Sequence, residues 1–499
     1  MKKSILSLAV AAGISGTATA AMHINHQGVG EALVYPLYST QNGNDTYIHV
    51  VNTTSQAKAV KVRILEAKNS WEVLDFNLYM SPNDHFSFAL TEGEEGGAQL
   101  ITADKSCTVP TIDAPIPLKT LLFADEEDGS EARLQIGHIE VIEMGQIDSE
   151  SVVYDATLHG SDGVPADCDA HTALWTEGGA WFDEVETDGT ASTGFVTDWM
   201  GGGLYGMGQV INVANGTAFG YDAIAIADLV AEGASGSALH YFPGDTRPRF
   251  TDAAIDNVAI VETQAGSEMI AVADPITAVT SLFQTTILEN DFVVDPAINA
   301  TTDWVLTQPT KFYHTQAEPA LAPYSVSWDG TDACEPVTFD NWDREEQFIM
   351  VEEVTPTPET PVFSPSVPPE DPERPEVPDL LLCWETTILQ FGAESALNAE
   401  NVVATMSPDL LAGDEGWARL TFFPEGLNET NRGVVGTNRR IDYDSNADQV
   451  ADGFLNGMPV TGFAVVKYTN SSANEAGALA NYAVSTEHKS ATISSALVQ

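Results

Sequence analysis

Oxygen-bearing side chains alternate along residues 442–448, a spacing typical of the first half of a calcium-binding loop. The candidate ligands stand at every second position: Asp442, Asp444, Asn446 and Asp448. Calcium takes six to eight oxygen ligands, which a loop with this spacing supplies, and Asp452 follows in the next turn. Ala447 replaces the glycine usual in such loops, and no glutamate closes the loop. We predict bound calcium here, with a solvated acidic turn as the alternative.

Four cysteines form a second group of residues that can form disulfides or bind a metal ion: Cys107, Cys168, Cys334 and Cys383. Three disulfide connectivities are possible for four cysteines. We predict Cys107–Cys168 and Cys334–Cys383, because each bridge closes a loop of about 50–60 residues within one region, and each is expected to stabilise the fold by about 4 kcal/mol. A zinc site is the rival interpretation. It is disfavoured, because the sequence has no C-x-x-C pair and its histidines are scattered.

Catalytic motifs are absent from the sequence. It contains no G-x-S-x-G, no H-E-x-x-H and no Walker loop. His138 and Glu140 share one face of a predicted strand, and we interpret them as a surface pair rather than a catalytic or metal-binding pair. Carboxylates are so numerous that no two of them stand out as an acid–base couple. We therefore predict no catalytic residues and no enzymatic activity.

The charge of the chain is extreme, with 73 acidic residues against 20 basic ones and a net charge of −53. Such a charge repels nucleic acid and anionic lipid headgroups, so neither is an expected partner. Hydrophobic residues make up 43% of the chain, which includes nine tryptophans, and this composition indicates a folded protein. Folding under such self-repulsion calls for screening by salt or bridging by divalent cations.

The first twenty residues have the features of a secretory signal peptide. Lys2 and Lys3 precede an apolar segment over residues 5–14, and small residues at 18–20 supply a cleavage site. No later segment contains eighteen uninterrupted apolar residues, so we expect no transmembrane helix. The predicted localisation is therefore extracellular.

The elements that must position these residues are predicted to be mainly β-strands. Short runs rich in Val, Ile, Tyr and Phe alternate with polar turns from residue 30 to residue 90. Val60, Val62 and Ile64 point to one side of such a strand, and Lys61 and Arg63 to the other. This pattern predicts antiparallel immunoglobulin-like sandwich domains with long loops and little helix.

Other segments are predicted in the same way. Residues 134–144, 278–288, 303–313, 418–423, 462–468 and 481–485 are expected to be strands, and 221–232 a short helix. Nine prolines interrupt residues 355–379, which excludes a helix or a sheet ladder there.

These patterns divide the chain into five predicted parts. They are a signal peptide (1–20), an N-terminal β-sandwich (21–105), a central β-rich domain (106–330), a disulfide-bounded Pro-rich insertion (331–384) and a C-terminal β-rich region (385–499).

Several strand and turn segments together resemble those of a known family. They are GEALVYP (30–36), VVNTT (50–54), KAVKVR (58–63), GHIEVIEMG (137–145), PADC (165–168), TDWV (302–305) and GFAV (462–465). The chain resembles a family of exported acidic proteins of marine gammaproteobacteria that includes S-layer proteins of Pseudoalteromonas-type bacteria. The resemblance covers the whole mature chain, but none of these motifs has a catalytic meaning.

The resemblance implies a structural subunit that self-assembles into a two-dimensional lattice on the outer membrane of a Gram-negative bacterium. Its implied partners are copies of itself and lipopolysaccharide, the latter bound through divalent cations that bridge two anionic surfaces. The alternative is a secreted or surface-tethered adhesin or polysaccharide-binding protein of the biofilm matrix. A secreted hydrolase is a further reading.

Overall fold

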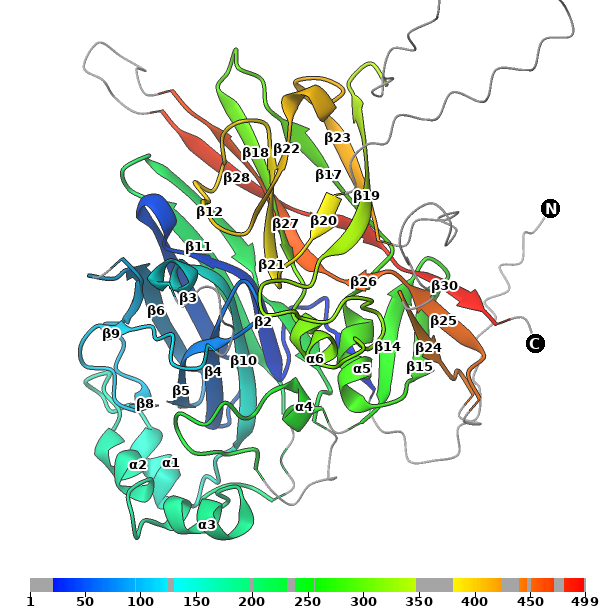
Figure 1. Cartoon of the computed structure of the whole chain (residues 1–499). Helices are drawn as coiled ribbons and strands as arrows, with labels where there is room; N and C mark the ends of the chain where they lie inside the picture. Colours follow the sequence, from blue (N-terminus) through cyan, green and yellow to red (C-terminus); the bar gives the residue numbers. More distant parts are fainter. Residues whose placement is uncertain are drawn as a thin grey trace, which may run out of the picture.

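The chain is built mainly from antiparallel β-sheets, which confirms the predicted β class (Figure 1). The computed structural model describes residues 21–94, 96–123, 130–197, 199, 201–230, 238–254, 256–346, 380–422, 439–446, 450–470 and 480–497. The predicted signal peptide and residues 347–379 of the predicted Pro-rich insertion lie outside these ranges. Two sandwiches form the body of the described protein, and the immunoglobulin-like detail stays a prediction.

The first sandwich consists of a nine-stranded sheet A and a six-stranded sheet B. Sheet A has the order β15-β14-β1-β13-β2-β10-β4-β5-β8, and sheet B the order β12-β11-β3-β6-β7-β9. Sheet A contains β1 (Met22–Ile24), β2 (Ala32–Ser39), β4 (Lys58–Glu66), β5 (Glu72–Met80), β8 (Cys107–Val109), β10 (Ile136–Gln146), β13 (Ile224–Ala227), β14 (Val258–Thr263) and β15 (Gly266–Ala271). Sheet B contains β3 (Asn44–Asn52), β6 (His85–Glu92), β7 (Ala98–Ile101), β9 (Ile116–Pro117), β11 (Leu204–Asn212) and β12 (Thr217–Asp222).

Strands from the predicted central domain complete both layers of this sandwich. β10 lies between β2 and β4 in sheet A, and β11 pairs with β3 in sheet B. A strand inside a sheet needs a partner on each side for its backbone hydrogen bonds, and here distant segments supply it. The sandwich therefore continues well past residue 105, where the sequence analysis placed a boundary.

The second sandwich consists of two five-stranded sheets in the upper part of Figure 1. Sheet C has the order β20-β19-β23-β17-β29, and sheet D the order β22-β21-β18-β27-β28. Sheet C contains β17 (Ile287–Val293), β19 (Glu335–Asp343), β20 (Leu380–Leu382), β23 (Glu415–Thr421) and β29 (Lys489–Ala491). Sheet D contains β18 (Ala300–Thr307), β21 (Thr386–Phe391), β22 (Val403–Met406), β27 (Thr461–Tyr468) and β28 (Tyr482–Glu487).

Sheet D contributes side chains to both sandwiches. Successive residues of a strand point to opposite faces, so Trp304 packs in the core shared with sheet C while Val305 packs in the core of the first sandwich. Phe463 of β27 stacks on Tyr221 of β12, with ring centroids 4.8 Å apart. One layer thus joins the two sandwiches, and β18 from the predicted central domain lies between two strands of the predicted C-terminal region.

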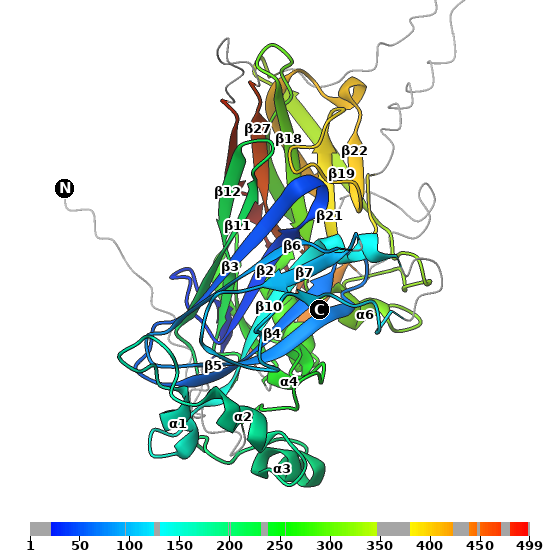
Figure 2. The same cartoon turned by 90° about the vertical axis from the view of Figure 1, so that its left-hand side faces the viewer.

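Small sheets and short helices complete the described structure. β16 (Gln284–Thr285) pairs with β26 (Met458–Pro459), and a three-stranded sheet consists of β24 (Arg440–Tyr443), β25 (Gly453–Asn456) and β30 (Ile493–Ala496). The α-helices are α1 (Val152–Thr157), α2 (Cys168–Leu174), α3 (Ala180–Asp188), α4 (Phe250–Ala253), α5 (Pro275–Leu282) and α6 (Lys311–Thr315). The 3-10 helices are η1 (Gln41–Gly43), η2 (Glu131–Gln135) and η3 (Pro408–Leu410). α1, α2 and α3 form a helical corner at one end of the first sandwich (Figure 2).

Three secondary-structure predictions are wrong, at least in part. The strand expected over residues 303–313 ends with β18 at Thr307, and the helix α6 begins at Lys311. The helix expected over residues 221–232 is replaced by the end of β12 and by β13, because the Ile-Ala-Ile-Ala run of β13 alternates with period two and pairs with β2. The strand expected over residues 278–288 is helical in its first half, which belongs to α5, and only residues 284–285 and 287–288 lie in strands. Asp274 begins this helix by accepting a hydrogen bond from the Thr277 N–H at 2.9 Å, and Pro275 occupies its first turn.

A layer of buried ion pairs covers the face of sheet A that points away from sheet B. Arg63 of β4 pairs with Glu140 of β10 and, at 2.8 Å, with Glu72 of β5. Lys61 pairs with Asp75 in the same layer, whereas Lys58 donates to Glu143 at 2.5 Å on the opposite face of the sheet, the one that points toward sheet B. These pairs follow from strand register, since Arg63 lies directly opposite Glu140.

His138 and Glu140 are therefore not the surface pair that the sequence suggested, because both are buried. Burial raises the pKa of Glu140, and the Arg63 guanidinium acts in the opposite direction. Burial also lowers the pKa of His138 to about 3, so its ring is neutral at physiological pH. Later segments cover the layer: Tyr241 accepts a hydrogen bond from Asn77, and a cavity of about 100 Å³ beside Arg63 is also lined by Arg249 and Tyr313.

Replacing Arg63 with methionine is predicted to destabilise the protein strongly. The change leaves two buried carboxylates, Glu72 and Glu140, without their cation, which costs about 3–5 kcal/mol of unfolding free energy. Urea denaturation at pH 7 measures the loss. The matched control is Arg344→Met, which removes the surface pair with Glu415 and is expected to cost less than about 1 kcal/mol. Equal losses in the two variants would contradict the role given to Arg63.

Candidate functional site

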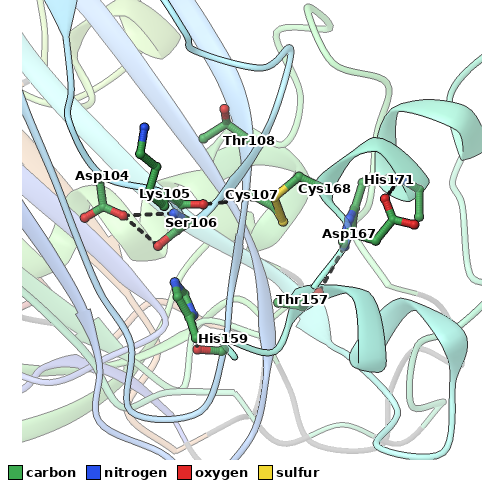
Figure 3. The surroundings of a disulfide bond; sticks show 12 residues. Asp104, Lys105, Ser106, Cys107, Thr108, Thr157, His159, Asp167, Cys168 and His171 are labelled. Carbon is green, nitrogen blue, oxygen red and sulfur yellow. Dashed lines mark hydrogen bonds between the residues drawn. A yellow bond between two sulfur atoms is a disulfide. The ribbon is translucent and has the colours of Figure 1, made fainter. Parts of the chain in front are cut away.

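Both predicted disulfides are present, Cys107–Cys168 and Cys334–Cys383. The first ties β8 to the first residue of α2, with Cα atoms 5.1 Å apart (Figure 3). Asp167 caps α2 by accepting from the Ala170 N–H, and His171 on the same helix bonds with Thr157 of α1 at 3.0 Å. The bridge therefore fastens the helical corner to the edge of sheet A.

The second bridge joins the start of the β19 region to the end of β20, and so closes the base of the segment predicted as a Pro-rich insertion. All four cysteines are used, so none is left for zinc. Disulfides persist in oxidising compartments and are rare in the cytosol. The two bridges indicate that the chain functions outside the cytoplasm.

Removing the first bridge in a Cys107→Ser/Cys168→Ser variant is predicted to destabilise the helical corner. The bridge closes a loop spanning 61 residues, for which chain entropy gives a stabilisation of about 4 kcal/mol. Guanidinium denaturation followed by tryptophan fluorescence reports the loss, because Trp175 and Trp181 pack in that corner. A Cys334→Ser/Cys383→Ser variant is the control, since its bridge lies elsewhere. An unchanged transition in the first variant would argue against this account.

The described part of the acidic segment, residues 442–446, leaves β24 at the margin of the small β24-β25-β30 sheet. Asp442 is exposed and pairs with Arg440, with Nε and Oδ1 3.0 Å apart. Asp444 accepts a hydrogen bond from the Asn446 N–H, and Asp452 accepts from Ser445 and Asn446. Asp448 lies outside the described residues. The described oxygens are thus held by donors from the protein itself.

No three carboxylates of this loop converge on one point within the described residues. There, the only group of three potential ligand atoms within 4.8 Å of one another comprises Asp332 and the two bridged sulfurs of Cys334 and Cys383. A calcium ion at Asp442 would have to compete with Arg440 for the carboxylate. Calcium at Asp442, Asp444, Asn446 and Asp448 therefore stays a prediction.

Basic residues are buried to an unusual degree in this acidic chain. Seven of its 20 lysines and arginines are buried within the described part: Lys58, Lys61, Arg63, Arg133, Lys311, Arg439 and Lys467. Nine carboxylate residues are buried with them: Glu31, Glu66, Glu72, Asp84, Glu140, Glu143, Asp303, Glu335 and Glu385. The deepest pairs include Arg439 with Glu335 at 2.7 Å and Arg133 with Glu66 at 2.9 Å.

The buried charges nearly balance one another, so almost all of the net charge of −53 lies outside this core. Several exposed arginines are also paired, among them Arg247 with Asp245 and Arg419 with Glu289. The exterior is consequently more one-sided in charge than the composition alone conveys. The sequence analysis missed this segregation, although the Lys61 and Arg63 alternation within a strand was its visible signal.

Glu31 is a buried carboxyl whose pKa is raised. Burial raises its pKa from 4.5 to about 8, and the neighbouring Glu143 and Asp228 add to the shift. Its Oε2 accepts from the Val230 N–H at 2.8 Å. Gly201 packs against it so closely that an added Cβ would lie 2.5 Å from the Glu31 Cγ.

No protein-family model, curated protein or solved structure matches the chain. Among the described residues, none of the helices is long and apolar enough to cross a membrane. The assignment of function therefore depends on the chain itself.

A Glu31→Gln variant is predicted to be more stable than the native protein at high pH and similar to it at low pH. The native carboxyl binds a proton up to about pH 8, whereas the unfolded one releases it near pH 4.5. The contribution of Glu31 to the free energy of unfolding is thus fully present below pH 4.5 and is lost as pH rises through 8, by at most about 1.4 kcal/mol per pH unit. Glutamine does not titrate and keeps the acceptor for Val230.

Thermal melts between pH 5 and pH 9 measure this effect as a difference in melting temperature that widens up to about pH 8 and then levels off. Glu150→Gln, at an exposed glutamate, is the control and is expected to give a constant difference. A Glu31→Gln difference that does not vary with pH would contradict the raised pKa.

Proposed function

We propose that this protein is an extracellular structural subunit that assembles with copies of itself into an S-layer lattice on the outer membrane of a Gram-negative bacterium. The observation that carries the proposal is the segregation of charge, with seven basic residues buried, most of them in ion pairs, and the acidic excess outside. The two disulfides and the family resemblance of the sequence support it. The proposed role is structural, with no catalytic residues assigned.

Divalent cations are the proposed connection between subunits. Salt at marine strength shortens the Debye length to a few ångströms, which removes long-range repulsion but leaves carboxylates facing one another at contact. Calcium offsets this remaining repulsion, since one ion coordinates oxygens from two chains at once. Exposed carboxylates such as Asp442 suit a bridging ion better than an enclosed site, because their partners are few and lie at the surface.

Lipopolysaccharide is the proposed anchor by the same chemistry. Its phosphates and the protein's carboxylates repel one another in the absence of a cation, and a shared divalent ion joins them. This mode of attachment requires no membrane-spanning helix.

Chelation is predicted to release subunits from cells without unfolding them. Removing calcium leaves the carboxylates at each contact uncompensated, whereas the two disulfides hold each chain together. Cells are treated with a chelator at constant ionic strength and imaged by electron microscopy, and the released protein is examined by circular dichroism. Re-adding calcium is expected to restore the lattice.

The control for this experiment replaces the chelator with an equal ionic strength of sodium chloride, which is expected to release nothing. An Asp442→Asn/Asp444→Asn variant tests the loop. A lattice that survives chelation would refute divalent bridging. If chelation removes the lattice but the Asp442→Asn/Asp444→Asn variant still forms one, the bridging ions lie at other carboxylates.

A further inference from the structure

The outer face of sheet C carries a pair of stacked tryptophans. Trp342 of β19 and Trp417 of β23 are directly opposite each other in register, with ring centroids 4.2 Å apart and planes 16° apart. Neighbouring residues such as Phe339 and Ala418 point inward and are buried, whereas both tryptophans are partly exposed. Two large aromatic rings thus lie on the solvent side of the sheet.

A groove of about 580 Å³ adjoins this pair, and Trp417 forms its aromatic wall. The volume falls within the roughly 300–1,000 Å³ of small-ligand sites. The remaining lining is polar: Glu289, Asn290, Asp291, Thr486, Glu487 and Lys489. β17, β23, β28 and β29 contribute these residues, so the groove exists only when sheets C and D are both assembled.

Charges of both signs lie around the groove, with the carboxylates in excess. Cross-strand register aligns Lys489, Glu289, Arg419 and Asp340 in one row of alternating sign. Arg419 donates to Glu289 at 2.7 Å, and its guanidinium carbon lies 5.4 Å from the Trp417 ring centroid, within the range of a cation–π contact. Within the strongly acidic exterior, this face brings cations and carboxylates together.

We propose that this face binds a neutral polysaccharide. The apolar C–H face of a sugar ring fits an exposed indole, as aromatic side chains combine a large apolar surface with a negative face. The carboxylates of Asp291 and Glu487 accept hydrogen bonds from sugar hydroxyls, and Lys489 donates to sugar oxygens. An acidic polysaccharide is disfavoured, because Glu289, Asp291 and Glu487 line the groove.

The site is independent of lattice formation. Binding uses the outer face of sheet C and needs no second copy of the chain. A subunit with such a site would also hold polysaccharide in the layer outside the cell, whether or not the subunits form a regular array.

The test is isothermal titration of the mature full-length protein with three hexasaccharides: maltohexaose, N-acetylchitohexaose and the anionic hexamer of galacturonic acid. At least one neutral hexamer is expected to bind, and the anionic hexamer more weakly. Trp417→Ala is expected to weaken binding about tenfold or more, the usual effect of removing a central aromatic contact. Asp291→Asn is expected to weaken it about threefold to tenfold, because an exposed hydrogen-bond acceptor loses its charge.

Tyr205→Ala on the outer face of sheet B is the matched control, since it removes an exposed aromatic ring outside the groove and is expected to leave affinity unchanged. If Trp417→Ala fails to fold, as judged by its melting temperature, Asp291→Asn decides the question. The proposal is overturned if no hexamer binds, if the anionic hexamer binds as tightly as the neutral ones, or if the folded groove variants bind as the native protein does. Loss of the lattice in Trp417→Ala without any glycan binding would instead make this face a contact between subunits.

Discussion

Arg63, held between Glu140 and Glu72, is the interaction on which the first sandwich depends. Sheet A is covered on both faces, by the apolar core on one side and by residues 238–254 and α6 on the other. A charged side chain on the second face has no access to water, so it must find its counter-charge within the sheet. Strand register supplies that partner, and the covering segments can then pack over a neutral layer.

The same pairing explains how an acidic chain with few cations folds at all. Seven of the 20 basic residues are buried in the core, so few cations remain at the surface to offset the exposed carboxylates. Self-repulsion is then a property of the surface, where salt and divalent ions reach it, rather than of the interior, where they do not. Stability and assembly thus become sensitive to ions through the exterior, while the buried pairs stay out of their reach.

Sheet D gives the second constraint on the architecture. Its strands present one set of side chains to each sandwich, so neither sandwich has a core that is separate from it. The tryptophan face of sheet C depends on this arrangement, because the groove beside Trp417 uses residues from β28 as well as β17. A substitution in sheet D would consequently alter the packing between the two sandwiches and the shape of the groove.

The sequence by itself determined the β class, most of the strands and both disulfides. The strands depend on alternation over a few residues, which is a local signal. The disulfides depend on four cysteines that fall into two pairs along the sequence, each pair about 50–60 positions apart. Local information was also present, but overlooked, for α5, where Asp274 and Pro275 mark a helix start. The acidic spacing of residues 442–448 was visible as well, yet the pairing of Asp442 with Arg440 appears only once the backbone is in place.

Tertiary structure alone decided what covers each face. Alternation assigns Lys61 and Arg63 to one side of a strand, but it cannot tell whether that side meets water or another segment. The covering residues lie far along the chain, as the 164 positions between Asn77 and Tyr241 show. The domain limits depended on long-range pairing for the same reason, with β10 and β11 completing sheets begun much earlier. Trp342 and Trp417 are separated by 75 positions and become neighbours only through the register of β19 and β23.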